Sequence, residues 1–221
     1  MRALVLLLIA GSTPPVPAAD AFDPRIALHV QPRVAKGDPC QSESVPASCG
    51  SFVTEGELGT GYNVYFVAVE ADPGVNGAIF AVSHTGDPYL EWTSCGTGTT
   101  TPTWPDSGSG ITLSWGANCQ TSSQVVLGSF YVYAYSDTEL KPESHPVLGG
   151  QPRIQECTDL TPVRESNVGR VAFSAGAVEG GCNPCAADCG PPPPPPEPEP
   201  PRVVLTEPVT GSFNFGSGAI L

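Results

Sequence analysis

Glycine and proline interrupt this chain so often that long regular helices are excluded. The 221 residues include 25 glycines and 26 prolines, which separate short runs rich in β-branched and aromatic residues. No window of a dozen residues has apolar positions at helical spacing without a glycine or proline inside it, apart from a short stretch after Val203. Short apolar runs divided by turn residues are typical of β-sheet proteins. The sequence therefore predicts an all-β fold.

The strongest predicted strand is 62–70, which has apolar residues at both its odd and its even positions. A strand that is apolar on both faces is expected at the centre of a sheet. Further strands are predicted at 23–30, 77–83, 89–92, 111–115 and 125–135, around Ile154, and at 168–173. About seven to nine strands at this spacing predict an antiparallel β-sandwich or jelly roll.

Residues 1–19 have the three parts of a secretory signal peptide. Arg2 supplies a positive charge, residues 3–10 are apolar, and small residues follow that suit a signal peptidase. The apolar run is too short to span a bilayer. A lipoprotein would need a cysteine just after this run, but the first one is Cys40. We therefore expect a protein that is secreted, extracellular or held at the cell surface.

Eight cysteines behind a signal peptide predict disulfide bonds. Sequence alone leaves the connectivity open. Proximity along the chain favours pairs of Cys40 with Cys49, of Cys95 with Cys119, and of Cys157 with Cys182 or Cys185, the other of which would join Cys189.

The predicted domain covers residues 20–190 and is followed by a proline-rich linker at 191–201. Consecutive prolines adopt an extended polyproline helix, so the linker is expected to be a stiff spacer. The remaining tail, 202–221, has strand character but is too short to fold alone. It is expected to be an anchor, a docking segment or the start of a truncated module.

The chain is acidic, with a formal net charge of -13. This charge repels phosphate backbones and no basic cluster relieves it, so a nucleic-acid partner is not expected. No stretch approaches the ~20 apolar residues that a membrane span needs. The expected partners are a protein or a glycan at the cell surface.

Most of the folded part, from Asp23 to Cys185, resembles a β-sandwich domain that recurs in uncharacterised secreted proteins of environmental bacteria. The matching pieces are Ile26-Ala-Leu-His29, Tyr62-Asn-Val-Tyr65, Trp104-Pro-Asp-Ser-Gly-Ser-Gly110, Cys119-Gln120, Phe130-Tyr-Val-Tyr-Ala-Tyr-Ser136 and Cys182-Asn-Pro-Cys185. More distantly, the strand order resembles the cohesin and carbohydrate-binding sandwiches. Cohesins lack this cysteine density, so dockerin binding is not carried over, and the resemblance implies no activity.

Catalytic chemistry has few candidates here. The three histidines are His29, His84 and His145, and none lies in a nucleophile elbow, so no catalytic residue is assigned. For glycoside hydrolysis by paired carboxylates, Glu91 beside Trp92 is the first position to inspect.

Two groups of residues have ligand types that suit a metal ion. Glu70, Asp72 and Asn76 crowd one loop and Asp87 follows the next strand, which makes them weak candidates for calcium. No cofactor other than calcium is expected. The sequence Cys182-x-x-Cys185 with Cys189 suits disulfides better than zinc, because a second cysteine pair or a nearby histidine is missing.

The one feature typical of a binding site is a row of tyrosines. In 125–135, Val126, Phe130, Val132 and Ala134 are predicted to face the core, and Tyr131, Tyr133 and Tyr135 the opposite side. Rings in a row on a sheet can stack on sugars or anchor a protein partner. The alternative is a structural aromatic ladder covered by a loop.

These features predict a secreted or cell-surface, non-catalytic β-sandwich module with a structural, adhesion or assembly role. A carbohydrate-binding accessory module is the alternative function, and a secreted glycoside hydrolase is the second alternative.

Overall fold

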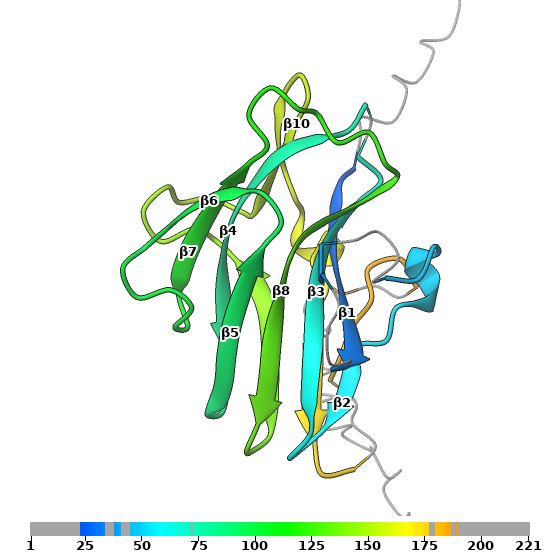
Figure 1. Ribbon diagram of the computed structural model, residues 1–221, viewed down its shortest axis with the longest axis vertical. Helices are drawn as coiled ribbons and strands as arrows, with labels where there is room; N and C mark the ends of the chain where they lie inside the picture. Colours follow the sequence, from blue (N-terminus) through cyan, green and yellow to red (C-terminus); the bar gives the residue numbers. More distant parts are fainter. Residues whose placement is uncertain are drawn as a thin grey trace, which may run out of the picture. The chain divides into compact units, whose positions relative to one another are not determined.

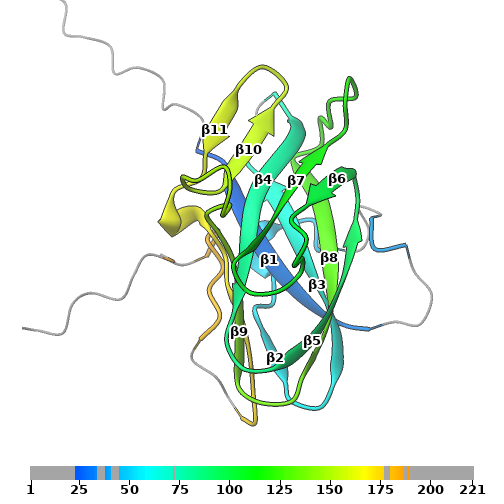
Figure 2. The same ribbon diagram turned by 90° about the vertical axis from the view of Figure 1, so that its left-hand side faces the viewer.

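The computed structural model describes residues 23–33, 38–40, 45–71, 73–176, 180–186 and 189. These residues fold into two β-sheets packed face to face (Figures 1 and 2). The predicted signal peptide, linker and tail, and Asp72 of the calcium candidates, lie outside the described residues. No helix in the described ranges is long and apolar enough to cross a membrane.

The first sheet has four antiparallel strands in the order β1-β3-β8-β5, which lie side by side in Figure 1. Their bounds are β1 Arg25–Pro32, β3 Gly61–Val69, β8 Gln124–Ala134 and β5 Pro88–Ser94. The strand predicted to be central from its apolar residues on both faces is β3, which has β1 and β8 as neighbours.

The second sheet runs β11-β10-β4-β9-β12-β2, with β7 on the other side of β4 and β6 beside β7 (Figure 2). Its strands are β2 Glu55–Glu57, β4 Val75–His84, β6 Thr97–Thr100, β7 Ser109–Ser114, β9 Thr138–Glu143, β10 Arg153–Glu156, β11 Leu160–Pro162 and β12 Val171–Ser174. Two 3-10 turns complete the elements, η2 Cys49–Ser51 and η3 Glu165–Asn167.

The all-β sandwich is confirmed, with two differences from the prediction. The described residues form twelve strands, four more than were predicted. The sequence did not reveal β2, β6, β9 and β11, because these strands carry few apolar residues; all four positions of β6 are exposed. The sheets are also not purely antiparallel. In the second sheet, strand β2 pairs in parallel with β12.

An aromatic cluster fills the space between the two sheets. Phe66 and Phe80, from opposite sheets, have ring centroids 5.5 Å apart. Trp92 lies 4.7 Å from Phe130 and 5.6 Å from Trp104, measured between ring centroids. Trp92 and Trp104 therefore anchor the core. Trp115 also packs against it and donates a hydrogen bond to the carbonyl oxygen of Cys95.

A bulge in β8 changes one core prediction. Phe66 of β3 pairs with Gly128 and the next residue, Val67, pairs with Val126, so Leu127 is an extra residue in the ladder. The bulge resets the alternation of side chains. Leu127 points into the core, and Val126, predicted to do so, instead packs with Val67 on the outer face.

All eight cysteines are paired, as predicted, but most of the expected pairs are wrong. The bonds join Cys40 with Cys95, Cys49 with Cys185, Cys119 with Cys157, and Cys182 with Cys189. Of these, only the last was among the expected pairs. Proximity along the chain failed because sheet pairing brings together cysteines that are 38 to 136 residues apart in sequence.

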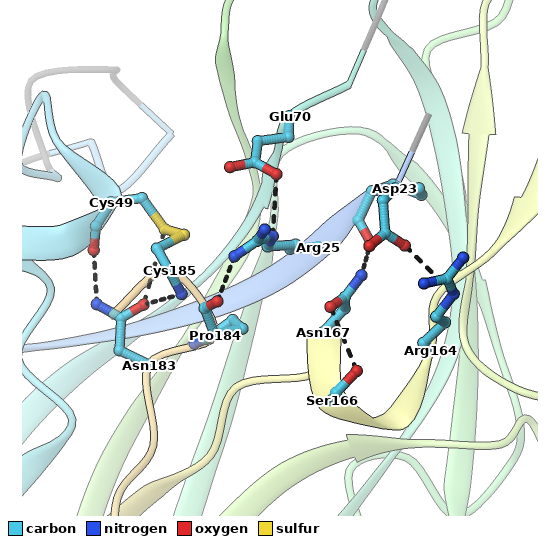
Figure 3. Close-up of polar contacts among 11 residues, drawn as sticks. Asp23, Arg25, Cys49, Glu70, Arg164, Ser166, Asn167, Asn183, Pro184 and Cys185 are labelled. Atoms are coloured by element: carbon cyan, nitrogen blue, oxygen red, sulfur yellow. Dashed lines mark hydrogen bonds and ion pairs between the residues drawn. A yellow bond between two sulfur atoms is a disulfide. The ribbon is translucent and has the colours of Figure 1, made fainter. Parts of the chain in front are cut away.

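The C-terminal segment 180–186 is fastened to the start of β1 (Figure 3). Asn183 donates a 2.6 Å hydrogen bond to the carbonyl oxygen of Cys49, beside the Cys49–Cys185 disulfide. Arg25 donates to the carbonyl oxygen of Pro184 and forms a 2.9 Å ion pair with Glu70. The last part of the described domain is thus held at the Arg25 end of the first sheet.

Candidate functional site

Half of the outer face of the first sheet is covered. Val45 and Phe52 belong to residues 45–53, the segment before β2, which we call the covering segment. They pack on a small apolar cluster of Ala27, Tyr65, Val67, Val69 and Val126. The Cys49–Cys185 and Cys40–Cys95 disulfides border this cluster. This half is therefore a second, minor core.

The other half of the same face carries tyrosines. In the register of the sheet, Tyr133 of β8 pairs with Tyr89 of β5, and Tyr131 pairs with Glu91. None of these residues belongs to the covered cluster. We call Tyr89, Tyr131, Tyr133, Tyr135 and Glu91 the tyrosine surface. It lies where β8 ends and where β3 and β5 begin, the lower end of the sheet in Figure 1.

The rings on this surface contact one another at angles. Tyr89 and Tyr131 have centroids 6.0 Å apart with their planes at 65°, and Tyr133 and Tyr135 have centroids 4.9 Å apart. The Tyr131 ring lies over Gly61 of β3, where an added Cβ would come within 2.7 Å of the tyrosine oxygen. A glycine at this position therefore lets the ring lie flat along the sheet.

A cation already rests on this surface. The guanidinium carbon of Arg33 lies 4.3 Å from the centroid of the Tyr131 ring. The backbone of Arg33 is held in place, because its N–H donates to the carbonyl oxygen of Gly61. This geometry is that of a cation–π contact.

The predicted tyrosines are neither all exposed, as a binding face would require, nor all covered, as in a purely structural ladder. Tyr131 and Tyr133 are half-buried by neighbouring rings, glycines and Arg33. Tyr135 follows the end of β8 and is 68% exposed. Sequence reasoning missed Tyr89, which is 52% exposed, although it alternates with Leu90 and Trp92 on the core side.

Two of the three histidines have structural contacts. His29 is buried under the covering segment, and its Nδ1 accepts a 3.0 Å hydrogen bond from the N–H of Val53. Burial lowers the pKa of His29. His145 is also buried, and its Nδ1 accepts from the N–H groups of Val147 and Leu148. Burial and, to a smaller extent, the charge of Arg153 lower the pKa of His145.

Of the calcium candidates that the structure describes, Asp87 lies far from Glu70 and Asn76. Glu70 is engaged with Arg25, and Asn76 lies near the start of β4. Asp87 lies beyond the other end of that ten-residue strand, roughly 30 Å away along the chain. The described residues contain no group of three or more His, Cys, Asp or Glu placed to hold a metal ion.

Among solved structures, the fold of this chain is similar to cohesin modules. No family model and no curated protein matches the sequence. A cohesin module from a Clostridium perfringens family 33 glycoside hydrolase is 10% identical, with a TM-score of 0.39 over 67% of this chain and 98% of that one. The sixth cohesin of Acetivibrio cellulolyticus scaffoldin B, solved with a Cel5 dockerin, is 13% identical, with a TM-score of 0.39 over 69% and 99%.

A type II cohesin domain from the Acetivibrio cellulolyticus cellulosome is 9% identical, with a TM-score of 0.39 over 66% of this chain and 94% of that one. The distant cohesin resemblance expected from the strand order is thus found again in the structure. These low TM-scores carry no argument about what this chain binds.

Proposed function

We propose that this protein is a secreted or cell-surface, non-catalytic recognition module that serves adhesion or assembly through its tyrosine surface. The observation that carries the proposal is the division of one sheet face. One half is covered by a segment fastened with disulfides, whereas the other half presents Tyr89 and Tyr135 to solvent. Partly exposed aromatic rings on a rigid sheet are suited to partner binding, because little side-chain entropy is lost.

Two observations favour recognition over catalysis. The Nδ1 atoms of His29 and His145 are occupied by backbone N–H donors, so they are engaged structurally. Glu91, the first carboxylate to inspect for glycoside hydrolysis, pairs across the sheet with Tyr131 rather than with a second acid.

The test compares exposed residues on and off the tyrosine surface. The mature protein and its Tyr89→Ala and Tyr135→Ala variants are assayed for binding to a glycan array and to intact bacterial cells. Val147→Ala and Leu148→Ala are the matched controls, because these side chains are also exposed but lie in the loop between β9 and β10. We expect the tyrosine variants to lose binding, with stability unchanged to within about 0.5 kcal/mol. Binding that survives both tyrosine changes would contradict the proposal.

A glycan ligand is kept as the second candidate function. Asn63 of β3 and Glu91 of β5 both pair with Tyr131, one from each side, so an amide and a carboxylate flank this ring. An aromatic ring flanked by an amide on one side and a carboxylate on the other offers stacking and hydrogen bonds to a sugar. Positive spots on the glycan array that disappear in the Tyr89→Ala variant would favour this function.

A further inference from the structure

We infer that the tyrosine surface binds a segment of a partner protein that carries arginine or lysine side chains. The inference rests on the proposed function, since it names the kind of partner that the same surface recognises.

Arg33 shows within the chain how such a side chain would bind. Its guanidinium group lies over the Tyr131 ring at 4.3 Å, which is within the range of favourable cation–π contacts. The Tyr89 ring plane is inclined at 65° to that of Tyr131 and Tyr89 is half exposed, so its ring is open to a second cation. Guanidinium and ammonium groups both use this kind of contact, with arginine the more frequent.

Three carboxylates lie on the tyrosine surface or in the turns next to it. Glu91 is exposed and pairs with Tyr131 across the sheet. Asp87 precedes β5 and Asp137 lies two residues after Tyr135. The turns that hold them touch, since Gly86 lies against the carbonyl group of Asp137. Within the described part of the chain, these three carboxylates form no ion pair. A cationic segment would place opposite charge next to them while its side chains stack on the tyrosines.

The same charges disfavour two other occupants. A second copy of the chain has the same formal net charge of -13, so two copies repel each other when their tyrosine surfaces meet. A neutral glycan could stack on the rings but would leave the charges of Asp87, Glu91 and Asp137 without a counter-charge. Charge complementarity therefore selects a basic protein segment.

The experiment uses defined probes and the mature chain. Amide chemical shifts of the isotope-labelled protein are recorded with (Gly-Arg)₄, (Gly-Lys)₄ and (Gly-Ser)₄ peptides and with cellohexaose. We expect the two cationic peptides alone to shift amides of residues 59–63, 88–93 and 129–135. Raising the salt from about 50 to about 500 mM should weaken this binding several-fold, because exposed charge pairs are screened.

Matched variants separate the site from general attraction to an acidic protein. Glu91→Gln and Tyr89→Ala should each weaken peptide binding about two- to fivefold. Glu165→Gln removes the same charge from the exposed 3-10 turn η3 and should leave the affinity unchanged. Equal losses in Glu91→Gln and Glu165→Gln, or shifts spread over all acidic regions, would overturn the inference.

The inference and the proposed function can fail separately. If cellohexaose shifts the tyrosine-surface amides and the cationic peptides do not, the basic partner is wrong and the recognition function stands. The same holds if no probe shifts them while Tyr89→Ala still abolishes binding to cells. If the peptides bind but both tyrosine variants still bind cells, the proposed function is wrong.

Discussion

Gly128 shows how one residue supports the aromatic core. A Cβ at this position would lie 2.3 Å from Cζ2 of Trp92 and 2.6 Å from the carbonyl oxygen of Thr93. The indole is held by Phe130 and Trp104 and cannot retreat freely. Gly128→Ala should therefore cost about 1–3 kcal/mol of stability, as overpacking of a core does.

Chemical unfolding of the variant measures this cost. Gly176→Ala is the control, because no atom of the residues that the structure describes lies within 4 Å of its added Cβ. A Gly128→Ala variant as stable as the control would show that Trp92 has room to move.

A second prediction at the residue scale concerns pH and His29. Burial lowers the pKa of His29 in the folded state below the usual histidine value of 6.5. The unfolded chain thus binds more protons than the folded one as the pH falls below about 6.5, so the free energy of unfolding decreases there. Protonation at Nδ1 would also break the hydrogen bond from Val53.

His29→Gln should remove this contribution and flatten the pH dependence of stability between pH 7.5 and 5.5. Urea unfolding at several pH values measures it, with His84→Gln as the control that keeps the buried His29. Parallel stability curves for the wild type and His29→Gln would contradict the prediction.

At the scale of elements, two of the disulfides differ strongly in the length of chain that they enclose. The Cys49–Cys185 bond closes a loop of 136 residues, whereas Cys182–Cys189 closes only seven. Because a longer closed loop restricts the unfolded chain more, its removal should cost more, about 5 against about 2.5 kcal/mol in the chain-entropy model. Thermal melts of the two double Cys→Ser variants test this order. A reversed order would mean that native contacts of the short loop, and not loop entropy, dominate.

The elements also show what the sequence could and could not predict. Strand β3 was recognisable because its apolar residues on both faces are a local signal, and the alternation in β8 placed Tyr131 and Tyr133 on one side. The bulge at Leu127 was not recognisable, since it arises from pairing with β3. Tyr89 joined the surface through the register of β5 on β8, which is a contact between strands distant in sequence.

At the scale of the whole domain, Pro184 and the tyrosine surface lie at opposite ends of the first sheet. Arg25, which holds Pro184, pairs with Val69 at one end of β3, whereas Tyr133 pairs with Gly61 at the other. The eight residue steps from Gly61 to Val69 along β3 span about 26 Å. A partner bound to the tyrosines would therefore not meet the Cys182–Cys189 region. This arrangement followed from long-range pairing and could not be predicted from composition.

The last prediction concerns the domain's dependence on oxidation. Four disulfides tie the two sheets, the covering segment and the C-terminal segment together. Each typically contributes about 2–4 kcal/mol, and together they approach or exceed the roughly 5–15 kcal/mol by which a domain is stable. The fully reduced chain should therefore lack a cooperative thermal transition, whereas protein from an oxidising compartment should melt cooperatively. Intact mass should show the oxidised chain lighter by eight hydrogens, with no thiol labelled. Several reactive thiols in the folded, oxidised protein would contradict the pairing, and a cooperative melt of the reduced chain would show that the sandwich core is stable alone.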